Sequence, residues 1–238
     1  MEYSKEYLSG GIYVCTSKEH TFGTDAILLA DFANPTAKTK AVDFGSGCGI
    51  IPFFFHSRGK CDTIYAVEIQ KQGYEQIKLA ADDQKIDKII PIHADLKELK
   101  DKLPFGQFDL VTMNPPYKQL GGGVMSSSES DKIARHESAA NIYDIALSAS
   151  KLLKFGGRIC MCQRPERLCD TIDALRKADC EPKRIRFVHQ RVGEAPWLFL
   201  IEGKRGRKPD IITEPPLYIE EKGDYSEEYR RIYREYQG

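Results

Sequence analysis

Short apolar runs that alternate with amphipathic segments are the feature of this 238-residue sequence that most restricts its fold. The apolar runs have the length and composition of buried strands, whereas the segments between them have the spacing of helices. Strands separated by helices predict a parallel sheet with helices on both faces. The predicted strands cover residues 40–44, 63–68, 88–93, 108–113 and 158–162, and the predicted helices cover residues 49–57, 71–84, 96–100, 141–153 and 165–177.

The pattern changes beyond residue 177. Two further strands are predicted at residues 184–190 and 197–201, and the link between them is too short for a parallel crossover. This pair is therefore expected to be antiparallel. The predicted fold class is α/β, with a Rossmann-like, mostly parallel sheet that ends in an antiparallel C-terminal strand. Residues 118–132 and 202–216 predict loops, and a helix is predicted near the C-terminus from an apolar stripe formed by Tyr229, Ile232, Tyr233 and Tyr236.

Length and composition limit the classes of protein to which the chain can belong. Its length fits one domain over residues 1–238, with an N-terminal extension at 1–35 and a C-terminal extension at 203–238. We expect a cytoplasmic protein without a metal, because the sequence shows no secretory leader or membrane span and its seven cysteines fit no zinc or disulfide framework. Acidic and basic residues number 35 each, so a polyanion can be attracted only by a local patch.

A glycine-rich turn follows the first predicted strand. Glycines at alternate positions let the backbone turn tightly and approach a ligand closely, and the helix that follows offers its N-terminus to a negative group. A nicotinamide-binding loop would place its third glycine at residue 50, where this chain has isoleucine. The spacing instead suits S-adenosylmethionine, which has no pyrophosphate, and the expected cofactor-binding residues here are Asp43, Gly45, Ser46, Gly47 and Gly49.

Acidic residues at the ends of the next two predicted strands are candidates for contacts with the same cofactor. Glu68 lies at the distance from the glycines that is expected for an acid that binds ribose hydroxyls; the alternative is a solvated residue at a strand end. Asp95 is placed to accept a hydrogen bond from the adenine amino group, or else it caps the helix predicted after it. Ile69 and Leu96, next to these acids, are expected to line the same site.

The tetrapeptide Asn114-Pro115-Pro116-Tyr117 directly follows the fourth predicted strand. Ligands bind beyond the carboxyl ends of strands in open α/β sheets, so this turn is expected to border the cofactor. An amide or aryl amine nitrogen is a poor nucleophile because its lone pair is delocalised. The Asn114 side-chain oxygen and the Pro115 carbonyl can hold its two N–H bonds, which directs the lone pair at a methyl donor, while Tyr117 stacks on a planar substrate. The alternative is a proline-rich turn without a catalytic role.

These motifs, together with three further runs, resemble the tRNA1(Val) (adenine-37) N6-methyltransferase family within the class I S-adenosylmethionine-dependent methyltransferases. The runs are Phe22 to Ala30, Ala134 to Glu137 and Glu214 to Tyr218. The Asn-Pro-Pro-Tyr motif alone is shared with DNA adenine, rRNA guanine and protein glutamine methyltransferases. The resemblance implies a seven-stranded sheet of the class I type. It also implies that the substrate is the adenine beside the anticodon of a valine tRNA, that Thr24 and Asp25 lie against the methionine end of the cofactor, and that Asn114 contacts both cofactor and target amine.

Contacts with the RNA are expected from basic residues. Arg135, in the second of these runs, is one candidate, although it and His136 also suit the exposed start of a helix. Lys204, Arg205, Arg207 and Lys208 form the densest local basic patch, which is expected to contact phosphates beside the site or else to be simply solvated. The target base must leave its stack, which costs less in an anticodon loop than in duplex DNA.

Two other functions compete with RNA adenine methylation. A protein glutamine N5-methyltransferase would use the same N–H geometry, but about forty residues precede the glycine loop, too few for the helical domain that such enzymes carry. The third possibility, from a different class, is an RNA-binding module without catalysis, against which the intact Asn114 and Glu68 argue. The sequence does not distinguish a monomer from a homodimer.

Overall fold

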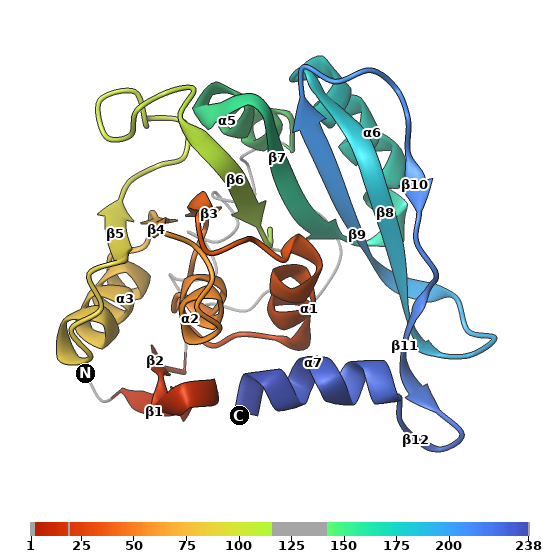
Figure 1. Cartoon of the computed structure of the whole chain (residues 1–238), viewed down its shortest axis with the longest axis horizontal. Helices are drawn as coiled ribbons and strands as arrows, with labels where there is room; N and C mark the ends of the chain where they lie inside the picture. The colour runs from red at the N-terminus through yellow and green to blue at the C-terminus, as the bar shows by residue number, and fades with distance from the viewer. Residues whose placement is uncertain (1–2, 19, 116–141, 238) are drawn as a thin grey trace, which may run out of the picture.

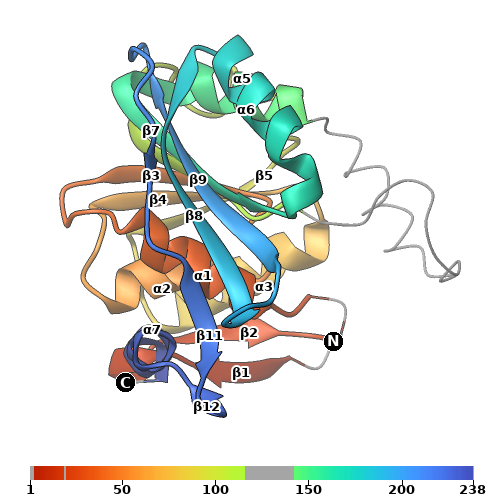
Figure 2. The same cartoon turned by 90° about the vertical axis from the view of Figure 1, so that its right-hand side faces the viewer.

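A computed structural model describes residues 3–18, 20–115 and 142–237, with side chains of the last helix described through residue 233. Its centre is a twisted sheet that runs through the whole molecule, with helices packed on both of its faces (Figures 1 and 2). Pro116, Tyr117, Arg135 and His136, and the loop predicted at residues 118–132, lie outside the described residues.

The core of the sheet confirms the predicted fold class. Seven of its strands lie in the order β5-β4-β3-β6-β7-β9-β8. All neighbours from β5 to β7 are parallel, whereas β9 is antiparallel to both β7 and β8, as the short link between β8 and β9 predicted. The strands are β3 (Lys40–Phe44), β4 (Thr63–Glu68), β5 (Ile89–His93), β6 (Phe108–Met113), β7 (Leu153–Gln163), β8 (Cys180–Arg191) and β9 (Pro196–Arg205).

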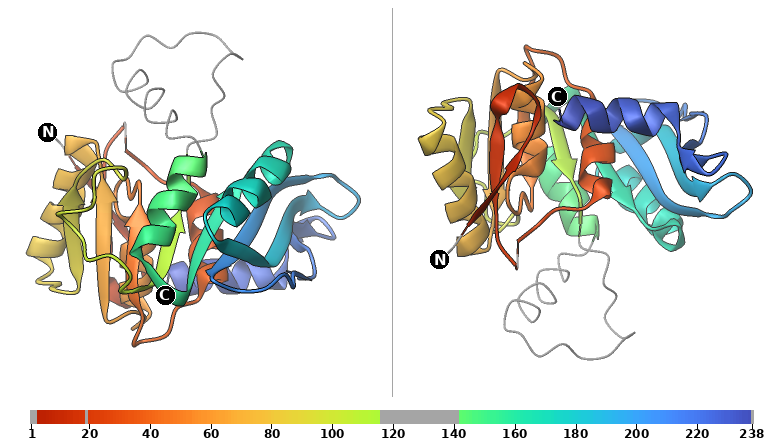
Figure 3. Two further views of the ribbon diagram at one scale, coloured as in Figure 1. Left: turned by 90° about the horizontal axis from the view of Figure 1, so that it is seen from above. Right: turned by 90° about the horizontal axis from the view of Figure 1, so that it is seen from below.

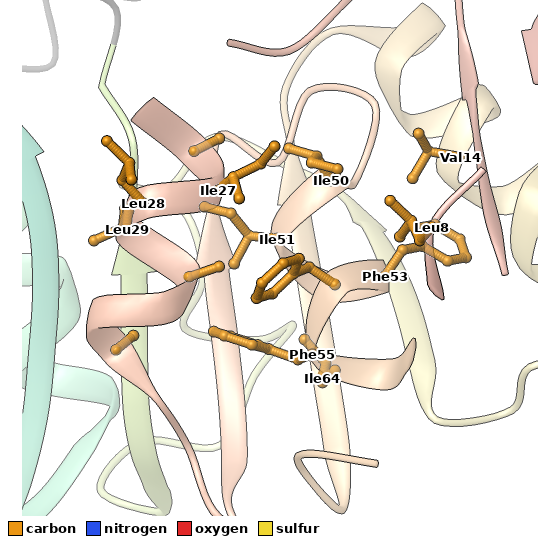
Figure 4. Packing of buried hydrophobic residues seen from close by; sticks show 14 of the residues in the cluster. Leu8, Val14, Ile27, Leu28, Leu29, Ile50, Ile51, Phe53, Phe55 and Ile64 are labelled. Carbon is orange, nitrogen blue, oxygen red and sulfur yellow. The ribbon is translucent and has the colours of Figure 1, made fainter. Parts of the chain in front are cut away.

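Alternate residues of each strand are buried under different helices, which is what a period of two in a two-faced sheet requires. Ala41 and Leu110 pack with α1, α2 and α3, while Val42 and Val111 pack on the other face with α5 and α6. Figure 4 shows the first layer, where Ile27 of α1 lies beside Ile51 of α2 and Phe53 of α2 lies beside Leu8. These helices are α1 (Thr24–Ala33), α2 (Ile50–Ser57), α3 (Lys71–Asp83), α5 (Ile142–Leu152) and α6 (Leu168–Lys177).

Two of the predicted elements differ in kind from the structure. Residues 96–100 form turns and no helix, because the Asp95 side chain accepts the Lys97 N–H at 2.8 Å and so closes a single local turn. Residues 202–216 are only partly a loop, since β9 continues to Arg205 and residues 212–213 pair with β8. An exposed sheet edge offers unpaired backbone groups that such a segment can satisfy.

The C-terminal extension widens the sheet beyond the seven predicted strands to ten in the described part of the chain. The added strands are β10 (Ile212–Thr213), β11 (Leu217–Glu221) and β12 (Asp224–Tyr225). The predicted C-terminal helix is present as α7 (Glu227–Gln237), and Tyr229 and Ile232 are buried on one of its faces. Figures 1 and 3 show α7 beside α1 and close to β1 (Ser4–Tyr7) and β2 (Tyr13–Thr16). These two strands form a separate antiparallel sheet.

Candidate active site

The glycine-rich loop lies at the carboxyl end of β3, directly before α2. Gly45, Gly47 and Gly49 have φ angles of 61°, 56° and 86°, a left-handed backbone that side chains with a Cβ rarely adopt. The loop is fastened to the neighbouring strand by the Ser46 N–H, which donates to the Val67 carbonyl at 3.1 Å. The alternating glycines are therefore required by the turn itself.

Glu68, at the end of β4, is anchored against this loop. One carboxylate oxygen accepts the Gly47 N–H at 2.7 Å and the other accepts the Gln70 N–H at 2.8 Å. The residue is only 4% exposed, so the alternative of a solvated strand-end acid is wrong. Each oxygen keeps a further lone pair, and two such acceptors suit a vicinal diol.

Glycine is also required at residue 73 on the helix behind this loop. A Cβ added to Gly73 would lie 2.8 Å from the Gly47 carbonyl oxygen and 3.0 Å from the Glu68 side chain. The contact with the Gly47 carbonyl is closer than real Cβ atoms show and the contact with Glu68 is tight, so the backbone of α3 approaches the loop more closely than a side chain would allow. This close approach helps to keep Glu68 in place.

Asp43 connects the loop to the strand that carries Asn114. Its carboxylate is buried at 1% exposure and accepts the Thr112 hydroxyl of β6 at 2.6 Å. Burial raises the pKa of Asp43 to about 7, against the opposing hydrogen bonds of the Thr112 and Ser46 hydroxyls, and the charge of Glu68 raises it further. Asp43 thus holds β3 and β6 together from inside the sheet, and its place as a direct cofactor ligand stays a prediction.

Asp43 is expected to make the stability of the protein depend on pH. Its pKa is 3.8 in an ordinary environment and about 7 here, so the folded protein binds a proton that the unfolded chain releases. The comparison is Asp43→Asn, whose amide oxygen can still accept from Thr112. Relative to this variant, the wild type should lose up to about 1.4 kcal/mol of unfolding free energy for each unit by which the pH rises from 3.8 to about 7. Guanidinium unfolding of both proteins at one-unit pH intervals measures this, and a difference that does not change with pH would contradict it.

The other predicted cofactor residues lie around the same edge of the sheet. Thr24 begins α1 and its side chain lies near the Tyr229 hydroxyl of α7, while Asp25 accepts its neighbour's N–H at 3.0 Å. Asp95 closes a local turn and caps no helix, so that interpretation of it is wrong, and its contact with the cofactor stays a prediction. Ile69 is 39% exposed directly after Glu68, and Leu96 packs partly buried against the sheet.

Asn114 and Pro115 follow β6 and complete the set of predicted site residues at this edge of the sheet. Pro115 is buried, and the Asn114 Oδ1 lies 3.0 Å from the thiol sulfur of Cys162 on β7. Because β5, β4, β3 and β6 are parallel neighbours, their carboxyl ends bring Asp95, Glu68, the glycine loop and Asn114 to one edge. The structure therefore assembles acceptors for a diol and for an amine at adjacent strand ends.

The predicted basic patch does not lie at this edge. In the pairing of β9 with β7, Lys204 stands opposite Arg158, whereas the end of β7 at Gln163 stands opposite Phe199. The antiparallel return of β9 thus carries residues 204–208 to the opposite edge. There the Arg205 side chain donates to the Leu153 carbonyl and Arg207 lies over the Phe155 ring, so the expectation that Lys204, Arg205, Arg207 and Lys208 flank Asn114 is wrong.

Sequence reasoning missed several residues that the structure brings to the site. Cys162 and Thr112 contact predicted site residues, and Tyr229 reaches Thr24 from the far end of the chain. Arg164, directly after β7, lies over the Trp197 ring and donates to the Trp197 carbonyl at 2.9 Å. Only the register between β6 and β7 reveals that Cys162 lies beside Asn114, so no local sequence signal could have identified it.

Comparison with known proteins identifies the family. Residues 14–166, which include the glycine loop, Glu68 and Asn114, match the methyltransferase small domain. The chain belongs to this family. The fold agrees with that of a solved, predicted O-methyltransferase from Agrobacterium tumefaciens, to which it is 20% identical with a TM-score of 0.68 over 89% of this chain and 96% of the other.

Two curated relatives carry the name tRNA1(Val) (adenine(37)-N6)-methyltransferase, the name of the family that the sequence resembles. The protein of Flavobacterium johnsoniae is 30% identical over 140 residues, and that of Histophilus somni is 33% identical over 144 residues. The aligned parts span 57% and 58% of the length of this chain and of each relative. Within the described residues, no helix is long and apolar enough to cross a membrane, and no cluster of three or more His, Cys, Asp or Glu is arranged to hold a metal ion.

Proposed function

We propose that the protein is an S-adenosylmethionine-dependent methyltransferase that modifies the exocyclic N6 amine of adenine in RNA, with the base beside the anticodon of a tRNA as its target in the cytoplasm. The observation that carries the proposal is the position of the Asn114 side-chain oxygen, at the carboxyl end of β6 next to the glycine loop of β3. The names of the curated relatives support adenine in tRNA over a protein glutamine.

The residues at the edge of the sheet fit this cofactor. The left-handed glycine loop leaves backbone exposed to a ligand without side chains in the way, and Glu68 is fixed with lone pairs that can accept two ribose hydroxyls. We assign Thr24 and Asp25, at the start of α1, to the methionine end, and Ile69, Asp95 and Leu96 to the adenine end. When bound, the cofactor supplies an electrophilic methyl group on a sulfonium sulfur.

The chain's contribution to the reaction is to hold the amine. The Asn114 Oδ1 and the Pro115 carbonyl each accept one N–H of the target, which makes the nitrogen more tetrahedral and frees its lone pair. The prolines restrict the turn and so fix the direction of that carbonyl. Alignment of two reactants in this way can supply about 7–11 kcal/mol of the barrier, and the extra proton leaves once the nitrogen is cationic.

Incubation of the protein with methyl-labelled cofactor and unmodified tRNA tests the proposal. Nucleoside analysis should find N6-methyladenosine, and an isolated anticodon stem-loop should be a better substrate than duplex DNA of the same sequence because its bases unstack more easily. Label found only in polypeptide would favour glutamine methylation. Absence of N6-methyladenosine from every tRNA, with the cofactor shown to bind, would favour the non-catalytic RNA-binding module.

A further inference from the structure

Cys162 stands next to the residue on which the proposed reaction depends. In the parallel pairing of β6 and β7, Met113 is opposite Met161, so the chain positions that follow, Asn114 and Cys162, lie side by side at the carboxyl edge. The thiol sulfur is 3.0 Å from the Asn114 Oδ1, and Cys162 is fully buried. The thiol is thus held against the oxygen that would receive the target amine.

A donor at this position has a specific consequence for a carboxamide. The two ends of an asparagine side chain have nearly the same shape but opposite hydrogen-bonding character, and only the oxygen end can accept the N–H of an amine. An S–H that donates to Oδ1 favours the orientation in which the oxygen lies on this side, and a carboxamide oxygen can accept two hydrogen bonds, so this contact is compatible with a second one from the substrate. Because Cys162 is buried in a strand, its sulfur stays in place if the Asn114 side chain rotates, and the hydrogen bond is then lost.

We propose that Cys162 is a positioning residue, whose thiol holds the Asn114 carboxamide oxygen in the orientation that receives the N6 amine; this rests on the proposed function. A second cysteine, Cys160, lies nearby but has its sulfur toward a different residue, so it serves as a control for the contact between Cys162 and Asn114. Cys160 is also fully buried, two residues earlier on the same face of β7, but its sulfur faces Glu202 at 3.8 Å. Substitutions at the two cysteines therefore distinguish the effect of losing a buried sulfur from the effect of losing the contact with Asn114.

The first test compares steady-state kinetics of Cys162→Ala, Cys162→Ser and Cys160→Ala with unmodified tRNA. Loss of one weak hydrogen bond that matters in the transition state predicts that Cys162→Ala lowers kcat about three- to tenfold with the KM for the cofactor unchanged. Cys162→Ser should recover kcat to about half of the wild-type value or better, because a hydroxyl also donates. Cys160→Ala should keep the wild-type kcat. Equal losses in the two alanine variants, or no loss in either, would overturn the proposal.

A second measurement does not depend on turnover. The side-chain amide signals of 15N-labelled asparagine report whether the Asn114 carboxamide has one orientation, with Asn114→Ala used for assignment. We expect one well-resolved pair of Asn114 signals in the wild type, Cys162→Ser and Cys160→Ala, and broadened or shifted signals in Cys162→Ala. An unchanged pair in Cys162→Ala refutes the positioning role. If the wild type methylates no RNA, the proposed function fails, whereas these signals still decide whether Cys162 orients Asn114.

Discussion

Asn114→Ala is expected to lower kcat for methyl transfer by about a hundred- to a thousandfold while it changes cofactor affinity by less than about threefold. Removal of one preorganised hydrogen-bonding group from an active site typically has an effect of this size, because the interaction is made more strongly in the transition state than in the ground state. Asn114 lies after β6, whereas Glu68, which we assign to the cofactor, ends β4, and the glycines that we assign to it follow β3. Chemistry and cofactor binding should therefore separate in this variant.

Single-turnover rates with saturating tRNA and calorimetric titration of the cofactor measure the two quantities for Asn114→Ala. Gln163→Ala is a matched control, because Gln163 is a buried carboxamide at the end of the adjacent strand β7, and its oxygen accepts only the next residue's N–H at 3.3 Å among the contacts described. We expect less than about a threefold change in rate for Gln163→Ala. A wild-type rate in Asn114→Ala, or a rate lost only because the cofactor no longer binds, would refute the assigned role.

The parts of the site that depend on one strand end could be predicted from the sequence. A buried parallel strand is a nearly continuous apolar run, so its carboxyl end is visible in the sequence, and polar residues at that end face the edge where ligands bind. This explains why Glu68 and Asn114 were found at the correct edge without knowledge of how the strands pair. The left-handed turns at Gly45, Gly47 and Gly49 could likewise be predicted, because glycine is the residue that adopts this conformation without strain.

The parts that depend on pairing between distant strands could not be predicted. The basic residues 204–208 were expected at the active-site edge because their charge is visible in the sequence, but the antiparallel register of β9 places them at the opposite edge. In the same way, nothing near Cys162 in the sequence reveals that Asn114 is its neighbour. The short strands β10 and β11 form because β8 offers a free edge, and a free edge is a property of the assembled sheet.

Arg184→Ala is expected to lower the free energy of unfolding by about 3 kcal/mol at neutral pH. The guanidinium contacts Glu202 at 3.1 Å and Glu214 at 2.9 Å, donates to the Phe32 carbonyl at 2.7 Å and lies 4.0 Å from the Phe32 ring centre. Glu202 is 4% exposed, and although burial raises its pKa, the nearby cations, with Arg158 first, bring that pKa below its ordinary value. In the variant, Arg158 and Lys204 remain beside Glu202, but this buried carboxylate loses one of its charged partners and the Phe32 carbonyl loses its donor.

Arg191→Ala is the control that shows how much of the stability lost in Arg184→Ala depends on the burial of its ion pairs. Arg191, the last residue of β8, also pairs with two glutamates, Glu194 and Glu220, but its side chain is 59% exposed, and exposed ion pairs contribute little to stability. Guanidinium unfolding should therefore separate the variants by about 2 kcal/mol or more, with Arg184→Ala the less stable. Because Glu214 precedes β11 and α7, whose Tyr229 reaches Thr24, the same variant should also become more susceptible to proteolysis after residue 214 and bind cofactor more weakly. Equal stabilities for the two variants would mean that the buried cluster does not fasten the C-terminal segment to the sheet.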